Sequence, residues 1–411
     1  MPVSPTLAIS QEIARRRAAG LDTVALGFGE ASIPVHPELV RRLAQSAHRG
    51  DYGPVAGAPE LLEAVAGYWT RRGVATTAAE VVCGPGSKPL LYALFQALGG
   101  PVLLPRPCWV SYAAQAALLG HEALLVPTLP GHGGVPDPER LSAEAARLRA
   151  EGRPATTVLV TLPDNPTGTV AAPDVISELC AVAEEHDLAI ISDEIYLDLV
   201  HGDTEVLTPA EVLADRTITT TGLSKSLALG GWRIGAARIP ERHEAVRRQV
   251  TVAASEIWSA PAQPVQQVAA WAFTEPPELA PHVEASRALH GRIARTVAGI
   301  FTAAGAEVAP PTAGFYLYPD FAGRRDELAA SGIGTSADLA RVLLDQHGVA
   351  TLPGVAFGDL PERLALRVAP PMLYGRDDDQ RWQALASKTP EELPWIADSL
   401  AVLREALSRL V

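Results

Sequence analysis

The stretch TVLVTLPDNPTG (residues 157–168) decides the fold, because a short run of β-branched and aliphatic residues ends abruptly in polar residues and a turn. An amphipathic segment, Ala171–His186, follows at helical spacing. A second short run with a polar end, AIISDEIY (residues 189–196), comes next. Two strands joined by a helix of this length pair in parallel, since an antiparallel hairpin needs only a short turn. This unit therefore predicts a parallel β-sheet with helices packed on it.

The same alternation extends outward in both directions, from about residue 60 to about residue 240. The segments between the runs, such as Lys88–Leu98, have helical periodicity. The expected strands are Glu80–Cys83, Val102–Leu104, Leu124–Val126, Thr157–Thr161, Ala189–Ser192, Thr217–Thr221 and Arg233–Ile239. Strands flanked by helices form sheets that are buried on both faces. The predicted fold class is therefore α/β, with a mostly parallel sheet covered by helices on both faces.

A different pattern begins after the long helical stretch Glu278–Ala304. Short apolar runs at Ala306–Val308, Phe315–Tyr318 and Leu364–Val368 predict strands of a smaller α+β unit. The first ~40 residues have no strand–helix pair of their own, so we expect them to pack with that unit. The predicted domains are a large domain at 41–285 and a small domain made from both chain ends, 1–40 and 286–411.

Composition excludes several classes of protein. The chain of 411 residues is 47% hydrophobic and 20% charged, so it can bury a large core and is not disordered. Its formal net charge of −13 argues against nucleic acid or an anionic membrane as a partner. No apolar run approaches the ~18 residues of a membrane helix, and Met1–Arg17 has no signal-peptide pattern. We therefore expect a cytoplasmic protein with neither of these partners.

The rare residue types are also informative. The 3 cysteines are odd in number and widely spaced, so they predict neither a disulfide framework nor a zinc site, and we expect no metal. Lysine occurs only at Lys88, Lys225 and Lys388, while arginine is abundant. Because arginine can serve a solvated surface, each lysine is a candidate for a special role.

Polar residues follow four of the predicted strands, at the ends where parallel sheets bind ligands. The segments are GPGSK (residues 84–88), PDNPTG (163–168), DEIY (193–196) and GLSK (222–225), and Arg233 is expected to open the next strand.

Each segment has an ordinary explanation when taken singly. PDNPTG is a good turn sequence, Asp193 can cap the following segment, and a Gly86-Ser87-Lys88 stretch can simply begin a helix. Its spacing fits neither a Walker loop nor a dinucleotide fingerprint. A single lysine such as Lys225 is usually a surface residue. These explanations account poorly for the four segments occurring together.

Together the segments fit the chemistry of one cofactor. A helix start at Ser87, with Ser224 and Arg233, can hold a phosphate dianion. Lys225 can form an imine with an aldehyde. A carboxylate such as Asp193 can keep a pyridine nitrogen protonated, so that the ring accepts carbanion electrons. An amide and a phenol can donate to a ring oxygen. These groups outline a site for pyridoxal 5′-phosphate.

Longer motifs resemble those of one family. In chain order, NPTG (165–168), DEIY (193–196) and SKSLALGGWRIG (224–235) are similar to motifs of the class I/II aminotransferases, which are fold-type-I pyridoxal-phosphate enzymes. The chain resembles their bacterial aspartate aminotransferase-like members. The likeness covers nearly the whole chain, from GFGE (27–30) to LRV (366–368). These motifs are specific for the family and only weakly specific for the substrate.

The resemblance implies a role for each matching residue. Lys225 would carry the cofactor as an internal aldimine and move the Cα proton, with Asp193 and Tyr196 as the other catalytic residues. The implied cofactor-binding residues are Gly86, Ser87, Lys88, Trp109, Asn165, Asp193, Tyr196, Ser224, Lys225, Arg233 and, from the neighbouring subunit of a homodimer, Tyr52. The implied substrate-binding residues are Gly29, Trp109, Asn165 and Arg367, of which the arginine would clamp the α-carboxylate through two N–H groups.

The implied function is that of a transferase in amino-acid metabolism. A pyridoxal-phosphate-dependent aminotransferase would move the amino group of an L-amino acid to a 2-oxo acid by a ping-pong mechanism through the Lys225 aldimine. The same residues set up Cα–H cleavage, which lyases, cyclases, oxidases and decarboxylases on this fold also use. An enzyme of that kind, in specialised amino-acid metabolism, remains the alternative.

Several features stay open at this level. In the aspartate aminotransferase-like subgroup, a lysine at the position of Lys88 can contact the distal carboxylate of an acidic substrate, or it can simply support the phosphate. Asp164 stands where Ser or Asn is more usual, and EASIPVHP (30–37) lacks the usual Pro-Asp. The tail after Arg367 is longer than usual and either lines the substrate pocket or elaborates the surface. The Asn165–Pro166 bond, which can be cis in relatives, cannot be assigned from the sequence.

Overall fold

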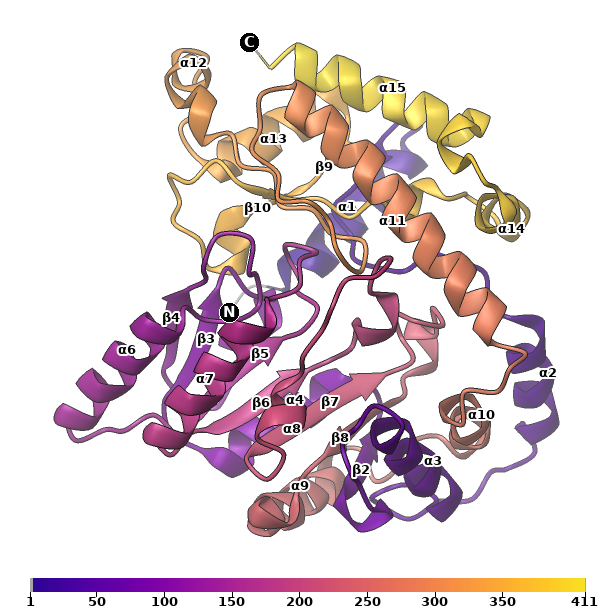
Figure 1. The fold of residues 1–411 in the computed structure, drawn as a ribbon. Coiled ribbons are helices and arrows are strands. Elements are labelled where there is room, and N and C mark those ends of the chain that lie inside the picture. Colours follow the sequence, from indigo (N-terminus) through magenta and orange to yellow (C-terminus); the bar gives the residue numbers. More distant parts are fainter. Residues whose placement is uncertain (1–2, 411) are drawn as a thin grey trace.

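A seven-stranded sheet is the core of the lower part of the protein in Figure 1, in a computed structural model that describes residues 3–410. Its strands are β2 (Val81–Gly84), β3 (Val102–Arg106), β4 (Ala123–Pro127), β5 (Thr157–Thr161), β6 (Ala189–Asp193), β7 (Thr217–Gly222) and β8 (Gly235–Arg238). They are ordered β2-β8-β7-β6-β5-β3-β4, and every neighbouring pair is parallel except the two that involve β8. The prediction of a mostly parallel sheet is confirmed.

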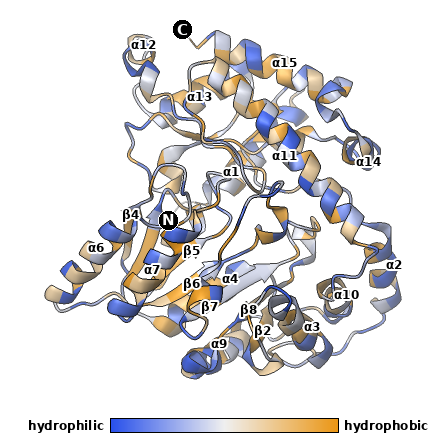
Figure 2. Cartoon of the chain, viewed as in Figure 1, coloured by the Kyte–Doolittle hydropathy of each residue, from blue (hydrophilic) through white to orange (hydrophobic). Residues whose placement is uncertain are grey.

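Helices cover both faces of the sheet. The helices of this part of the chain are α2 (Pro37–Ser46), α3 (Pro59–Thr70), α4 (Ser87–Leu98), α5 (Val110–Leu118), α6 (Pro138–Ala150), α7 (Pro173–Glu185), α8 (Pro209–Val212), α9 (Glu244–Ile257) and α10 (Gln263–Phe273). Successive side chains of a strand point to opposite faces. In β5, Val158 and Val160 accordingly join a core cluster with α6 and α7, whereas Leu159 joins another with α4, α5 and α9. This two-sided burial explains why β5 is strongly hydrophobic (Figure 2).

The register of the central strands aligns their carboxyl ends. Thr161 at the end of β5 lies opposite Asp193 at the end of β6, and Asp193 lies opposite Thr220 of β7. Polar residues that follow these strands in the sequence therefore meet at one edge of the sheet, as parallel pairing predicts.

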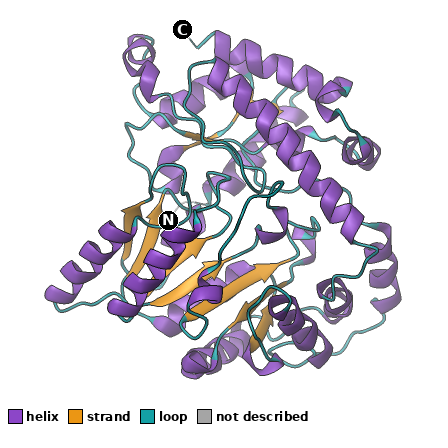
Figure 3. Cartoon of the chain, viewed as in Figure 1, coloured by secondary structure: helices purple, strands orange, loops and turns teal. Residues whose placement is uncertain are grey.

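A second, smaller α+β unit packs beyond that edge, and it is made from both chain ends. Its elements are α1 (Pro5–Ala18), β1 (Val24–Ala25), α11 (Ala280–Ala303), α12 (Arg325–Ala330), α13 (Ser336–His347), β9 (Val349–Ala350), β10 (Leu352–Pro353), β11 (Leu366–Arg367), α14 (Asp378–Ala386) and α15 (Pro394–Ser408). β1 pairs in parallel with β9, and β10 pairs antiparallel with β11. Figure 3 shows how short these strands are beside the surrounding helices.

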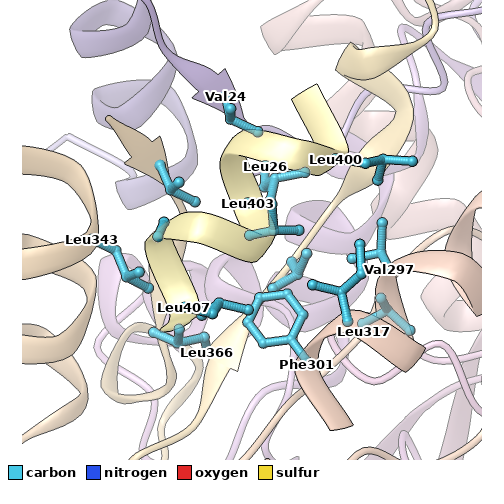
Figure 4. Packing of buried hydrophobic residues seen from close by; sticks show 14 of the residues in the cluster. Val24, Leu26, Val297, Phe301, Leu317, Leu343, Leu366, Leu400, Leu403 and Leu407 are labelled. Atoms are coloured by element: carbon cyan, nitrogen blue, oxygen red, sulfur yellow. The ribbon is translucent and has the colours of Figure 1, made fainter. Parts of the chain in front are cut away.

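One apolar core holds this smaller unit together. Val24 and Leu26, from the start of the chain, pack in it with side chains from α11, α13 and α15. Figure 4 shows the close packing around Phe301, Leu403 and Leu407. Side chains from both ends of the chain therefore share this core, whereas Val35 and Leu39 pack with α3 and α10.

The strands of the C-terminal part are shorter than predicted. Ala306–Val308 and Phe315–Tyr318 form only single bridges, Glu307 with Asp320 and Leu317 with Val368. Leu364–Val368 contains the two-residue β11, flanked by single bridges at Ala365 and Val368. Prolines cause this interruption. The flanking sequence holds Pro310, Pro311 and Pro319, and a proline has no N–H to donate to a ladder.

The tail after Arg367 packs against α11. Tyr374 is fully buried, and its hydroxyl lies 2.8 Å from Nδ1 of His290 on α11. Trp382 of α14 stacks edge-on against His282, also on α11, with ring centres 5.8 Å apart. The tail therefore belongs to the core packing of the smaller unit, and none of its described residues lines the cavity at the carboxyl edge of the sheet. Among the helices within residues 3–410, none is long and apolar enough to cross a membrane.

Candidate active site

A cavity of about 300 Å³ lies where the carboxyl ends of β5, β6 and β7 approach the start of α4. The residues predicted from the sequence that line it are Gly29, Ser87, Lys88, Trp109, Asn165, Asp193, Tyr196, Ser224, Lys225, Arg233 and Arg367. Two predicted residues do not line it. Gly86 lies behind Arg233, and Tyr52 is 91% exposed on the surface. Both ends of the chain thus contribute to one cavity.

Asp193 is a buried carboxylate at the end of β6, only 2% exposed. It accepts hydrogen bonds from the Tyr112 hydroxyl at 2.8 Å and from the Thr220 hydroxyl at 3.2 Å. Burial raises the pKa of Asp193 to about 6, although these hydrogen bonds and the nearby Lys225 oppose the increase. No lysine or arginine within residues 3–410 forms an ion pair with it. A buried carboxylate in this position is suited to a cationic ligand group.

The start of α4 forms an anion cradle with Arg233. The first backbone N–H groups of an α-helix have no intrahelical partner, so they can bind an anion. A Cβ atom built on Gly86 would lie 2.5 Å from Nη2 of Arg233, and one built on Gly235 would lie 2.5 Å from the backbone nitrogen of Ser87. Glycine at both positions therefore lets the guanidinium and the helix start approach one another. Ser87 and Ser224 line the same part of the site.

Arg233 itself departs from the prediction. It was expected to open the strand, but β8 begins at Gly235, and Arg233 adopts a left-handed conformation with φ of 56° after the short 3-10 helix Gly230–Trp232. Its Nη1 donates to the Gly230 carbonyl at 2.9 Å. The guanidinium lies beside Gly86 at the start of α4.

Lys225 projects into the cavity from the loop after β7. Its Nζ donates to the Gly29 carbonyl at 2.6 Å, and it lies 5.7 Å from the ring centre of Tyr196 and 5.8 Å from that of Phe315. Trp109, at the start of α5, lines the cavity with its ring edge-on to Tyr112, at 5.2 Å between centres. Lys225 therefore offers an amine, and Trp109 an aromatic ring, to a ligand bound in this cavity.

Asn165 and Tyr196 bring an amide and a phenol to the cavity. Both are buried, and Oδ1 of Asn165 has no hydrogen-bond partner within residues 3–410. The Tyr196 hydroxyl lies 2.9 Å from that of Tyr316. Burial raises the pKa of Tyr196 well above its usual value, so its hydroxyl is protonated at neutral pH. The cis peptide bonds of the described chain precede Pro107 and Pro163, and the Asn165–Pro166 bond is not cis.

Arg367 is a buried guanidinium in β11, 1% exposed. Its Nη2 donates to the Gly27 carbonyl, while its Nε has no partner among the described residues. A Cβ on Gly29 would lie 3.1 Å from Nη1 of Arg367, so glycine keeps the space beside the guanidinium open. A buried guanidinium with a free N–H and an open side is suited to a carboxylate.

Lys88 is the other cation of the site. Its Nζ lies 4.9 Å above the ring of Trp109 and, within residues 3–410, it has no carboxylate partner. Burial, followed by repulsion from Arg233 and Lys225, lowers the pKa of Lys88. A half-buried ammonium without a counter-ion is stabilised by any anion that enters the cavity.

Sequence reasoning missed several residues that line the cavity: Thr6, Leu7, Phe28, Glu30, Tyr112, Thr161, Ile195, Gly230 and Tyr316. Tyr112 had a usable signal, because it lies three positions after Trp109, and residues at this spacing share one face of a helix. Tyr316 had none, since its run was expected to be a strand and nothing in the sequence fixed the direction of its side chain.

These residues fit pyridoxal 5′-phosphate. The cradle that a Cβ on Gly86 would fill suits the phosphate, and the buried Asp193 suits a protonated pyridine nitrogen. The side-chain NH₂ of Asn165, in the cavity lining, can donate to the ring oxygen. Among the described residues, no group of three or more His, Cys, Asp or Glu side chains is arranged to hold a metal. The arrangement can therefore hold the ring and phosphate and place an amine beside the aldehyde carbon.

The chain is similar in sequence and in fold to known proteins. The family model described as aminotransferase class I and II matches residues 22–372. The aspartate/prephenate aminotransferase of Thermus thermophilus is 33% identical over 364 residues, covering 87% of this chain and 89% of the relative. The aspartate aminotransferase of Bacillus subtilis is 30% identical over 376 residues, covering 89% and 92%. The solved structure of the Thermus thermophilus aspartate aminotransferase with maleate superposes with a TM-score of 0.81 at 30% identity, covering 94% of this chain and 96% of that one.

Proposed function

The chain belongs to the class I and II aminotransferases, and from this premise we propose that it moves the amino group of an L-amino acid to a 2-oxo acid by a ping-pong mechanism. We propose pyridoxal 5′-phosphate as the cofactor and Lys225 as the residue that holds it covalently between half-reactions. One observation carries the proposal: the Lys225 amine, the buried Asp193 carboxylate and the anion cradle at Ser87 and Arg233 face a single cavity.

Each side chain of the cavity has a distinct task in this proposal. Bound pyridoxal phosphate supplies an electron sink next to the substrate Cα. Ser87, Ser224 and Arg233 hold the phosphate with the first N–H groups of α4. Asp193 keeps the ring nitrogen protonated, which is possible at neutral pH because its pKa of about 6 leaves it ionised there.

The remaining residues orient the ring and the substrate. Asn165 and Tyr196 donate to the ring oxygen, and Trp109 covers one face of the ring. Arg367 binds the α-carboxylate beside Gly29, which fixes the direction of the Cα–H bond. Lys225, once its amine is free, takes the proton from Cα and returns it to the cofactor carbon, since the amine that held the cofactor is then beside that carbon.

We further propose that acidic amino acids are among the substrates, with Lys88 binding their distal carboxylate. Its ammonium is half-buried and has no carboxylate partner in the described chain, and the relatives are named as aspartate or aspartate/prephenate aminotransferases. Lys88→Ala should lower kcat/KM for Asp and Glu at least about tenfold more than for Ala or Leu. Lys388→Ala, at an exposed lysine, is the matched control. An equal loss for acidic and neutral substrates would contradict this role.

We also propose a homodimer and a division of each chain into two domains. The protein is a homodimer in which Tyr52, 91% exposed in one chain, reaches the phosphate in the neighbouring subunit. The large, pyridoxal-phosphate-binding domain comprises 41–285, and the small domain comprises 1–40 and 286–411. Tyr52→Phe should weaken cofactor binding in the dimer, and sedimentation of the purified protein measures the state of association.

The deciding experiment is a single half-reaction. The purified, cofactor-loaded protein is mixed with one L-amino acid at a time, without a 2-oxo acid, while visible absorption and 2-oxo acid are measured. Loss of the visible band with stoichiometric 2-oxo acid supports the aminotransferase and identifies the donor. Lys225→Ala is the matched control and should show neither change. Release of ammonia, carbon dioxide or peroxide with the visible band restored would favour the lyase, decarboxylase or oxidase alternative.

A further inference from the structure

Tyr316 lies at the centre of the cavity wall and has no role in the proposal so far. Its side chain is 1% exposed, and its ring packs edge-on against Tyr196 at 5.5 Å and tilted against Phe315 at 4.6 Å. The Arg367 guanidinium lies 4.9 Å from its ring centre. A Cβ on Gly29 would be 2.3 Å from its hydroxyl. Packing on all these sides fixes both the ring and the hydroxyl.

Two acceptors lie within reach of the Tyr316 hydroxyl. The oxygen of Tyr196 is 2.9 Å away, and the Gly29 carbonyl is 3.4 Å away. Lys225 already donates to that carbonyl at 2.6 Å. The contact with Tyr196 is the shorter of the two by 0.5 Å, which favours Tyr196 as the acceptor of the Tyr316 proton.

If Tyr316 donates its proton to Tyr196, the proton of Tyr196 is free to point into the cavity. A hydroxyl has one proton, so when Tyr196 donates into the cavity, the hydrogen bond between the two hydroxyls uses the proton of Tyr316. Chains of hydrogen bonds strengthen one another, so a phenol that accepts a bond is a better donor.

We propose that Tyr316 is a positioning residue, whose hydroxyl donates to Tyr196 and so directs the Tyr196 proton toward the ring oxygen of the cofactor. The inference rests on the proposed function, because it needs the cofactor ring beside Tyr196. The hydroxyl of Tyr316 acts on the cofactor only through Tyr196. The ring of Tyr316 separately supports Arg367, and phenylalanine would preserve that support.

The test is Tyr316→Phe, read by a pH titration of the visible band of the loaded protein. With a weaker donor at the ring oxygen, more negative charge stays there, and the lysine-linked nitrogen beside it keeps its proton to higher pH. The midpoint should therefore rise by roughly half to one pH unit. The kcat should fall about two- to tenfold, while KM changes little because Arg367 is still supported. Tyr318→Phe is the matched control, since its hydroxyl bonds to Asp359 at 2.9 Å and lies outside the cavity lining.

A second variant isolates the route through Tyr196. In a Tyr196→Phe background, Tyr316→Phe should shift the midpoint no further. An unchanged midpoint in the single variant would overturn the inference, and so would a lower midpoint, because it would mean that Tyr196 is the donor. An additional shift in the double variant would also overturn it. If the wild-type protein shows no visible band with pyridoxal phosphate, the proposed function fails, whereas failure of the variants alone leaves that function standing.

Discussion

Replacing Asp164 by asparagine should stabilise the protein, increasingly so as the pH rises. Asp164 is 2% exposed, and one of its oxygens accepts hydrogen bonds from the Thr167 backbone and hydroxyl at 3.1 and 2.6 Å. The other oxygen has no partner within residues 3–410. Burial raises the pKa of this carboxyl from 3.8 to about 7. Asparagine keeps an acceptor for Thr167, carries no charge and is one of the residues that the family resemblance leads us to expect there.

The size of the effect follows from that pKa difference. Between about pH 4 and about pH 7 the folded chain holds a proton on Asp164 that the unfolded chain has lost, so raising the pH destabilises the wild type. At about 1.4 kcal/mol per pKa unit, the full penalty above the folded pKa is about 4 kcal/mol. Only about 1.5 kcal/mol of it is present at about pH 5. The advantage of the variant should therefore grow by roughly 3 kcal/mol between about pH 5 and about pH 8.

Urea unfolding at about pH 5 and about pH 8, followed by circular dichroism, measures this difference in the free energy of unfolding. Asp203→Asn changes the net charge equally at an exposed carboxylate and is the matched control. An advantage of equal size at both pH values would refute the reasoning, because the stability change would then not be linked to a proton. A variant less stable than the wild type at the higher pH would refute it as well.

Three other changes test the site and the core. Arg367→Lys keeps the charge but loses the paired N–H groups, so KM for the amino acid should rise at least about tenfold. The visible band of the bound cofactor should stay unchanged. A KM close to that of the wild type would exclude Arg367 as the residue that binds the α-carboxylate. Asp193 loses its negative charge as the pH falls through its pKa of about 6, so equilibrium titration should show weaker binding of pyridoxal phosphate below that pH. Asp193→Asn should remove this dependence, and a variant that retains it would place its origin elsewhere. Leu403→Ala, in the core of the smaller unit, should lower the free energy of unfolding by about 2–5 kcal/mol in urea denaturation. A loss under about 1 kcal/mol would show that the core around Leu403 is loosely packed.

The sequence predicted the sheet well because its strands are short, apolar and separated by helices. Thr157–Thr161 coincides with β5, and Ala189–Ser192 falls one residue short of β6. Once parallel pairing is assumed, the location of Asp193 and Lys225 at one edge follows directly. The register that sets Asp193 opposite Thr161 could not be read from the sequence, because it depends on how the strands pair.

Other parts of the site depend on contacts that leave no local signal. Arg233 reads as a strand residue, but its backbone is left-handed and its guanidinium lies beside Gly86, which is distant in the sequence. Tyr316 sits in an apolar run whose strand is interrupted by prolines nearby, so alternation could not give the direction of its side chain. The path of the tail was equally hidden, since its contact through Tyr374 is with a histidine on α11 far away in the sequence.

The pairing of β1 with β9 has a consequence for the order of folding. Val24, near the beginning of the chain, finds its strand partner at Val349. During synthesis the sheet, whose strands lie between residues 81 and 238, is complete long before that partner leaves the ribosome. The segment around Val24 therefore cannot pair until residues near Val349 have been synthesised. Closing a loop of this length is slow. Gly29 follows Val24 and Arg367 follows Val349, so the two meet only when this loop closes. The recovery of activity on refolding should therefore lag behind the recovery of secondary structure.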